Sequence, residues 1–216
     1  MKKGYLIAYF LILTIGIILS MDTAFIKQTD AASREAVSWV HNSNFLLSFL
    51  DGIGFLASKT GIITILALAA ILLALLYKHI LQPLIIVLAV YLGDLLNKAL
   101  KSFLGRERPL EPLHIEEGFS FPSGHAMVGV IFYGFLIYLL AGKIASSAVR
   151  RWLYAAVSIL MLLIGMSRVV TNAHFLSDVI GGYFIGLICL ILVIAVYDKL
   201  NEFLSAARRK KSGVSV

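Results

Sequence analysis

Three short polar segments interrupt an otherwise apolar chain and concentrate the residue types that phosphoryl transfer requires. They span residues 101–109, 121–125 and 167–178 and include three candidate phosphate-binding cations, two histidines and an aspartate. Phosphoryl transfer needs cations on the non-bridging oxygens, a nucleophile and a proton donor for the leaving group. No acidic cluster suited to Mg²⁺ or Zn²⁺ accompanies them, so we expect phosphoryl chemistry without a metal or cofactor.

The third segment contains the candidate nucleophile, His174. Asp178 follows four residues later, so a helix continuing into the next apolar stretch would place both side chains on one face. A carboxylate bonded to one imidazole nitrogen fixes the tautomer and leaves the other nitrogen nucleophilic. Taken alone, the pair also fits a plain buried ion pair.

The second segment reads Phe-Pro-Ser-Gly-His and ends at His125. Its proline and glycine permit a tight turn, after which a helix is expected to begin. A helix N-terminus presents free N–H groups and positive potential, which suit an anion. His125 would stand in the first turn facing that anion, although a histidine after a turn can also be a helix cap or an interface residue.

The first segment follows a helix face that carries three polar residues spaced three and four apart, namely Asp94, Asn97 and Lys101. We interpret Lys101 and Arg108 as phosphate ligands, together with Arg168 of the third segment. Lys98 and Arg106 are interpreted instead as cations that extend toward the membrane surface from a helix end.

The composition identifies the elements that must position these residues. The 216 residues are 60% hydrophobic and 14% charged, whereas soluble domains are about 45–50% apolar and about 25% charged. A single core of this size could not bury so much apolar surface, and disordered chains are poor in apolar residues. The chain is therefore expected to be an integral membrane protein. Its one cysteine, Cys189, excludes an intrachain disulfide and a cysteine-based metal site.

Six nearly uncharged stretches have roughly the length needed to cross the hydrocarbon core as helices. They are Gly4–Met21, Thr60–Tyr77, His79–Gly93 (running on past Asp94), Ala126–Gly142, Trp152–Ser167 and Val179–Tyr197. We expect an all-α polytopic protein, a bundle of six transmembrane helices in a single domain over residues 1–216. The Asp22–Lys59 segment is expected to form short helices along the outer interface, with Asp30 as a helix N-cap.

Lysine and arginine are unequally distributed between the two sides of this arrangement. The side with both termini holds 11 of the 19 basic and 2 of the 12 acidic residues, a balance of +9, and the other side has −2. The positive-inside rule makes both termini cytoplasmic and puts the polar segments at the outer face. The Arg208–Lys211 run is then a cytoplasmic anchor rather than a specific site for nucleic acid or anionic lipid. Lys2–Ser20 resembles a signal peptide but lacks an A-x-A site, so we interpret it as an uncleaved first span.

In order and spacing, the polar segments resemble the motifs of the type 2 phosphatidic acid phosphatase (PAP2) superfamily. Its pattern is K-x6-R-P, then P-S-G-H, then S-R-x5-H-x3-D, and all eleven specified positions match. The matching residues are Lys101, Arg108, Pro109, Pro122, Ser123, Gly124, His125, Ser167, Arg168, His174 and Asp178. The motifs cover Lys101–Asp178, and the six spans extend the resemblance to most of the chain.

The resemblance implies a mechanism in which His174 attacks phosphorus to form a phosphohistidine while Asp178 orients it. His125 would protonate the leaving oxygen and then act as base for the hydrolytic water. The phosphate would be bound by Lys101, Arg108, Ser123, the backbone N–H of Gly124, and Arg168.

A site at the mouth of a transmembrane bundle is expected to take a lipid. The chain most resembles the phosphatidylglycerophosphate phosphatase B group, which implies hydrolysis of phosphatidylglycerophosphate to phosphatidylglycerol. Undecaprenyl pyrophosphate is the alternative substrate, and an outer-face site suits it directly. A phosphotransferase that uses a lipid or sugar hydroxyl in place of water would carry the same motifs.

A channel, transporter or lipid-binding protein that only holds phosphate is the alternative outside the enzymes. Discontinuous helices near the bilayer midplane would favour transport, whereas the polar residues here are expected at one face.

Two further hypotheses concern the Leu110–Phe121 loop, a candidate gate for the head group, and Gly182 with Gly186. The G-x-x-x-G spacing of these glycines suits close packing inside the bundle or dimerisation.

Overall fold

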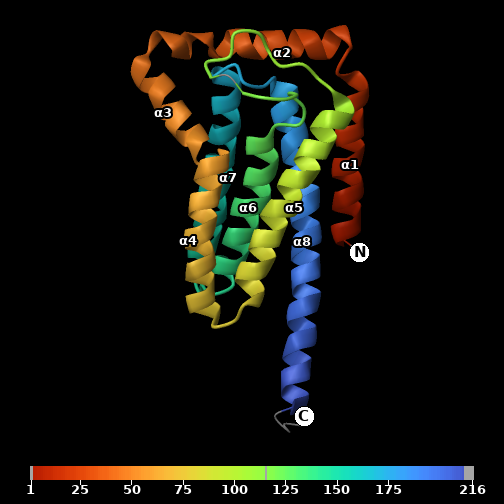
Figure 1. The fold of residues 1–216 in the computed structure, drawn as a ribbon, viewed down its shortest axis with the longest axis vertical. Helices are drawn as coiled ribbons and strands as arrows, with labels where there is room; N and C mark the ends of the chain where they lie inside the picture. Colours follow the sequence, from red (N-terminus) through yellow and green to blue (C-terminus); the bar gives the residue numbers. More distant parts are fainter. Residues whose placement is uncertain (1, 115, 212–216) are drawn as a thin grey trace.

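The computed structural model describes residues 2–114 and 116–211, which form a helical bundle (Figure 1). In chain order, the elements are α1 (Lys2–Ser20), α2 (Ala24–Val37), the 3₁₀ helix η1 (Ser38–Asn42), α3 (Asn44–Phe55), α4 (Lys59–Tyr77), α5 (Leu81–Leu104), α6 (Gly124–Ala141), α7 (Ser147–Val170) and α8 (Leu176–Lys211). Helices α1, α4, α5, α6, α7 and α8 are long and apolar enough to cross a membrane. The prediction of an all-α protein with six membrane-spanning helices is therefore confirmed.

Several spans are longer than the uncharged stretches predicted for them. Helix α5 continues past Asp94 to Leu104, and α8 runs from Leu176 to Lys211. Charged residues are acceptable in a helix once it leaves the hydrocarbon, so capping decides where the helix stops. Helix α5 ends at Leu104 and is capped by Gly105, whose φ of 62° is a left-handed conformation that glycine adopts without strain.

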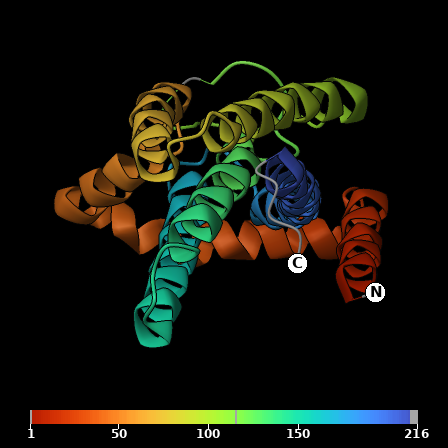
Figure 2. The same cartoon turned by 90° about the horizontal axis from the view of Figure 1, so that it is seen from below.

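Helix α2 lies across one end of the bundle, and α3, which follows η1, slopes from that end toward the start of α4 (Figure 1). Figure 2 shows α2 running across the bundle from α1. These are the short helices predicted between the first two spans, but the prediction of Asp30 as their N-cap is wrong. Thr23 caps α2 by accepting the N–H of Ile26. Asp30 lies in the middle of the helix, 2% exposed, because its carboxylate binds Arg106 and Ser177 beneath α2.

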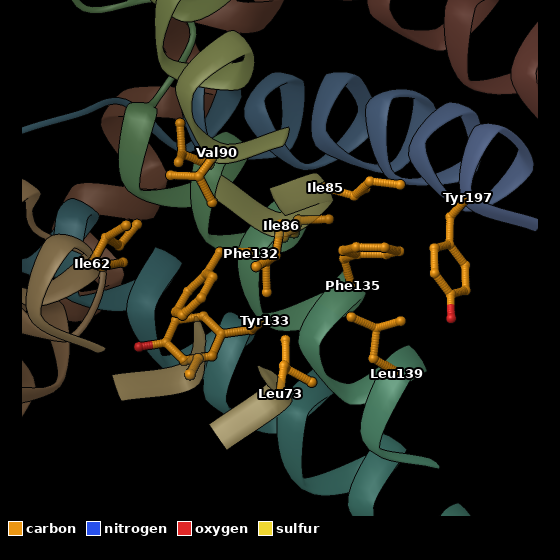
Figure 3. Packing of buried hydrophobic residues seen from close by; sticks show 14 of the residues in the cluster. Ile62, Leu73, Ile85, Ile86, Val90, Phe132, Tyr133, Phe135, Leu139 and Tyr197 are labelled. Carbon is orange, nitrogen blue, oxygen red and sulfur yellow. The ribbon is translucent and has the colours of Figure 1, made fainter. Parts of the chain in front are cut away.

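Helix α6 forms the centre of the bundle, and 67% of its span is buried. Its sequence is apolar on every side. Figure 3 shows Phe132 and Phe135 of α6 packed among Leu73 of α4, Ile86 of α5 and Tyr197 of α8. Because lipid tails are as apolar as these side chains, close van der Waals fit rather than exclusion from water holds such helices together.

Two glycines bring α8 directly against α6. A Cβ on Gly182 would lie 2.8 Å from the carbonyl oxygen of Ser123, and a Cβ on Gly186 would lie 2.8 Å from that of Met127. Only glycine allows the two backbones to approach this closely. The G-x-x-x-G pair therefore serves packing within the bundle, and it holds the N-terminal halves of α6 and α8 together.

The order of the helices brings the three polar segments to one end of the bundle. Helices α5 and α7 end beneath α2, and α6 and α8 begin there (Figure 1). The described residues of the connection between α5 and α6, 105–114 and 116–123, run over the same end. Residues from four helices and this connection consequently meet in one place.

Replacing Gly186 by alanine is expected to push α6 and α8 apart, because the added methyl group would overlap backbone rather than a flexible side chain. We expect a destabilisation of about 1–3 kcal/mol, measured as a lower thermal unfolding temperature in detergent. Gly16→Ala in α1 is the matched control, since no atom lies within 4 Å of its Cβ position. Equal unfolding temperatures for the two variants would contradict the packing role of Gly186.

Candidate active site

Asp178 is a completely buried carboxylate whose two oxygens are both bound. It is the third residue of α8, and its Oδ2 accepts the N–H of Phe175, just before the helix, at 2.9 Å. An acidic residue at this position satisfies a free N–H of the helix start. The same Oδ2 accepts the hydroxyl of Ser120 and lies 3.5 Å from Nδ1 of His174. The start of α8 thus fixes the carboxylate beside the imidazole.

The pairing of His174 with Asp178 was predicted from a shared helix face, and that reason is wrong. Helix α8 begins at Leu176, so His174 lies in the turn before it. There its N–H donates to the carbonyl oxygen of Arg168 at 3.1 Å. The turn, rather than a helix, places the imidazole against the carboxylate.

The surroundings of the buried His174 favour a neutral imidazole with its lone pair on Nε2. Burial lowers the pKa of His174, the charges of Lys101 and Arg108 lower it further, and Asp178 acts in the opposite direction. Because Nδ1 faces Asp178, the proton is favoured on that nitrogen. Nε2 faces Arg108, with Nη1 at 3.4 Å. A neutral histidine of this kind can act as a nucleophile at neutral pH.

Two arginines from different segments converge on Glu116 beside His174. Arg108 Nη1 donates to Glu116 Oε2 at 2.8 Å, and Arg168 Nη1 donates to Oε1 at 3.0 Å. Glu116 Oε2 is also 3.8 Å from His174 Nε2. Burial raises the pKa of Glu116, but the positive charges around it, those of Arg108 and Arg168 included, outweigh this and hold the pKa below its ordinary value. The carboxylate therefore marks an anion site formed by two guanidinium groups.

His125 borders the same anion site from α6. It is the second residue of the helix, as predicted, and its Nε2 lies 3.5 Å from Arg168 Nη1. Each histidine thus lies beside one of the two arginines that share Glu116. Four predicted site residues, His125, His174, Arg108 and Arg168, are brought together around this carboxylate.

The other predicted phosphate ligands lie next to this cluster. Lys101 Nζ donates to the carbonyl oxygens of Phe119 and Ser120, the latter at 3.2 Å. Gly124 is the first residue of α6 and, like Arg108, lines a cavity between α4 and α5. Ser123 is the N-cap of α6, and its buried hydroxyl has no hydrogen-bond partner among the described residues. A buried hydroxyl without a partner is costly, and a ligand oxygen would satisfy it.

The polar face of α5 has structural as well as site residues. Asn97 Nδ2 donates to the carbonyl oxygen of Pro122 at 3.1 Å and so holds the turn before α6. Asp94 instead forms a half-exposed ion pair with Lys98 at 2.6 Å. The prediction that Lys98 is a surface cation is confirmed.

The same prediction for Arg106 is wrong. Its guanidinium donates to Asp178 Oδ1 at 2.5 Å and to Asp30 Oδ2 at 2.8 Å, and its side chain is 14% exposed. Helices α2 and α8 each bring a carboxylate to this point, so the guanidinium is paired in the interior instead of solvated.

Glu116, Ser120 and Gly54 are site residues that the motifs do not include. A signal for Glu116 was available, because a concentration of buried cations calls for a carboxylate and the connection between the first two motifs carries three glutamates. Gly54 of α3 lies against Arg168, where a Cβ would be 2.5 Å from Nη2. No local pattern indicates this contact, since it joins residues far apart in the chain.

A cavity of about 520 Å³ extends from the cluster between α4 and α5. Arg108, Glu116 and His125 line one part of it, and the apolar part is lined by Ile62, Ile63, Leu66, Val87, Val90 and Val128. A cavity of this kind suits an anionic group attached to an apolar chain. Within residues 2–114 and 116–211, no group of three or more His, Cys, Asp or Glu side chains is placed to hold a metal ion.

Comparison with known sequences identifies related proteins. Residues 82–202 match the family model of the PAP2 superfamily. Phosphatidylglycerophosphatase B of Bacillus subtilis (strain 168) is 35% identical over 129 residues, which are 59% of this chain and 64% of that protein. Lipid phosphate phosphatase delta of Arabidopsis thaliana is 26% identical over 96 residues, 44% of this chain and 23% of that protein. The chain thus matches less than two thirds of the length of either relative.

Two solved structures share the fold. A crystal structure described as that of the first transmembrane PAP2 type phosphatidylglycerolphosphate phosphatase from Bacillus subtilis aligns with a TM-score of 0.84 and 27% identity, covering 90% of this chain and 97% of that one. Aquifex aeolicus LpxE aligns with a TM-score of 0.58 and 24% identity, over 74% of this chain and 93% of that one, a likeness of fold alone. Since the family model covers more than half of the chain, and the helices bring the three motifs together, this multi-pass membrane protein belongs to the PAP2 superfamily.

Proposed function

We propose that this chain hydrolyses the phosphate monoester of phosphatidylglycerophosphate, giving phosphatidylglycerol and inorganic phosphate. One observation carries the proposal. His174, held against Asp178, lies beside an anion site of two arginines at the head of a cavity with apolar walls. This arrangement combines a nucleophile, a phosphate clamp and a place for lipid tails.

In the first step, the lone pair of His174 Nε2 attacks phosphorus as the bond from phosphorus to the glycerol oxygen breaks. The imidazole gains positive charge during the attack, and the Asp178 carboxylate stabilises it through the Nδ1–H group. His125, in its protonated form, gives its proton to the leaving oxygen, so phosphatidylglycerol departs with that oxygen as a neutral hydroxyl group. The products of this step are the lipid alcohol and a phosphohistidine.

In the second step, His125 is neutral and accepts a proton from water as the water oxygen attacks phosphorus. The bond between phosphorus and Nε2 breaks, and its electron pair returns to His174. Inorganic phosphate leaves, and both histidines regain their starting protonation states.

The phosphate oxygens are bound by Arg108 and Arg168, with Lys101, the Ser123 hydroxyl and the N–H of Gly124 completing the site. Glu116 holds both guanidinium groups in this structure. A substrate phosphate must therefore replace its carboxylate. Because Glu116 belongs to the 110–121 loop, this exchange supports the hypothesis that the loop gates entry of the head group.

The charge distribution supports a site at the outer face, with both termini cytoplasmic. We assign the whole chain to one domain, because the motifs and their supporting helices share the same bundle. The names of the Bacillus subtilis phosphatases matched in sequence and in structure support phosphatidylglycerophosphate as the substrate. Undecaprenyl pyrophosphate is the second candidate, since an outer-face site would meet it directly.

Phosphate release by the purified protein in detergent with EDTA tests the proposal. Phosphatidylglycerophosphate, undecaprenyl pyrophosphate and phosphatidic acid are compared side by side, and we expect the first to be hydrolysed fastest. His174→Ala removes the nucleophile and should lower kcat by at least about 10⁴-fold. Preference for undecaprenyl pyrophosphate would change the substrate and keep the mechanism. A folded wild-type protein that releases phosphate from no lipid would contradict the enzyme and favour phosphate binding or transport.

Ile63→Trp tests whether the cavity between α4 and α5 holds the lipid tails. Ile63 lines this cavity and is 57% exposed, so a larger ring should narrow the groove without disturbing the core. We expect kcat/KM to fall about tenfold for the lipid, equivalent to about 1.4 kcal/mol, and to stay unchanged for p-nitrophenyl phosphate. Leu68→Trp is the control, because Leu68 is also exposed on α4 but does not line the cavity. Equal effects on both substrates would argue against this groove.

Glu116→Gln tests whether the loop carboxylate competes with phosphate. Removing its charge frees both guanidinium groups, so inhibition by orthovanadate at neutral pH should strengthen by about tenfold, or about 1.4 kcal/mol. The lowered pKa of Glu116 means that the wild type should approach the variant only at acidic pH, where the carboxyl is protonated. Glu117→Gln, one residue along the same loop, is the control. Weaker inhibition of the Glu116 variant would mean that the carboxylate positions the arginines instead.

A further inference from the structure

Arg106 joins the carboxylate that contacts His174 to a second buried carboxylate on α2. Its Nη1 donates to Asp178 Oδ1 at 2.5 Å, and its Nη2 donates to Asp30 Oδ2 at 2.8 Å. We propose that Arg106 is a positioning residue of the reaction: it orients Asp178 and sets the charge that His174 experiences, and Asp30 holds it in place. The inference rests on the proposed function, because it assigns a role in activating that nucleophile.

The geometry at Asp178 divides its two oxygens between two tasks. Oδ1 accepts the Arg106 guanidinium, whereas Oδ2 accepts the N–H of Phe175 and the hydroxyl of Ser120 and faces His174 Nδ1. With Oδ1 held by a guanidinium, rotation of the carboxylate about its Cβ–Cγ bond would break a charge-assisted hydrogen bond. Arg106 therefore keeps Oδ2 directed at the imidazole.

Asp30 is built into this arrangement. Its Oδ1 accepts the backbone N–H of Ser177 at 2.9 Å, and its Oδ2 accepts the Ser177 hydroxyl at 2.7 Å in addition to Arg106. Ser177 directly precedes Asp178 in α8. Arg106 also lies over the ring of Phe175, with Cζ 4.4 Å from the centroid. Through Asp30, helix α2 is thus bonded both to Arg106 and to Ser177 in the first turn of α8.

The charges of Arg106 and Asp30 predict how each residue affects the protonation of His174. Other charged or titratable groups around the imidazole are Lys101 of α5, Arg108 and Glu116 of the connection, His125 of α6 and Arg168 of α7. Against this constant background, Arg106 partly neutralises Asp178 and disfavours the imidazolium. Asp30 partly neutralises Arg106 and acts in the opposite direction. Removing the charge of Arg106 should move the acid limb of the pH profile of kcat/KM to higher pH. Removing the charge of Asp30 should move it to lower pH.

A cavity gives small molecules access to Arg106 from the end of the bundle covered by α2. Its volume is about 610 Å³, and its lining includes Arg106, Asp30, Arg34, Lys27, Glu107 and Asp22. A guanidinium compound that diffuses into this space could replace a deleted Arg106 side chain between the two carboxylates.

The test compares the wild type with Arg106→Ala, Arg106→Lys and Asp30→Asn on the lipid that the wild type hydrolyses fastest. Arg106→Ala should lower kcat about 10²-fold through misplacement of the nucleophile, with KM changed less than about threefold. Its acid limb should move to higher pH, and added methylguanidine should restore part of kcat. Arg106→Lys keeps the charge and should lower kcat without moving the limb. Asp30→Asn, which has nearly the same shape as the wild type, should move the limb to lower pH.

Arg34→Ala is the matched control, because Arg34 lines the same cavity and, among the described residues, forms no hydrogen bond or ion pair with Asp178. It should show wild-type kcat and no response to methylguanidine. Arg106 variants with wild-type kcat and pH profile would overturn the inference. So would a loss of kcat with neither a shift of the limb nor rescue by methylguanidine, which would indicate a purely structural role. A wild type without turnover would overturn the proposed function and this inference with it, whereas an active wild type with unchanged variants would overturn the inference alone.

Discussion

Burying charge at the end of a membrane-spanning bundle is costly, because each ion needs a protein partner in place of water. The carboxylate of Asp178 meets this requirement with bonds that also build the site. It caps the start of α8 and accepts hydrogen bonds from Ser120 and Arg106, which leaves one side for His174. Its backbone carbonyl accepts the N–H of Ser123 at 3.1 Å. One residue therefore holds the starts of α6 and α8 and the proposed nucleophile in a single frame.

The same cost explains why a carboxylate lies in the proposed phosphate site. Arg108 and Arg168 come from different segments, and holding two guanidinium groups close together requires an anion between them. Glu116 supplies that anion in this structure. A phosphate group carries more charge and more acceptor oxygens than a carboxylate, so it can replace Glu116 at the arginines. In the proposed mechanism, a phosphate at that position would lie within reach of His174, because Glu116 Oε2 is 3.8 Å from Nε2.

The apolar part of the bundle divides into a rigid side and an open side. Helices α6 and α8 are in backbone contact through Gly182 and Gly186, which fixes the motif residues at their first turns. On the other side, α4 and α5 border the cavity whose apolar walls lead to the anion site. A rigid base for the reacting groups beside an opening for lipid tails is what a reaction on a membrane lipid requires.

The amino-acid sequence by itself determined the all-α class, the six membrane spans and the motif residues. Hydrophobic length and motif spacing are local properties that need no knowledge of the fold. The tertiary structure decided which charges meet. A spacing of four indicated the correct partner for His174, although a turn rather than a helix brings the two together. Arg106 and Asp30 are 76 residues apart, and their local sequence is equally compatible with a surface cation and a helix cap. Only the packing of α2 over the starts of α6 and α8 buries them as a pair, because a buried charge is defined by what surrounds it rather than by its neighbours in the chain.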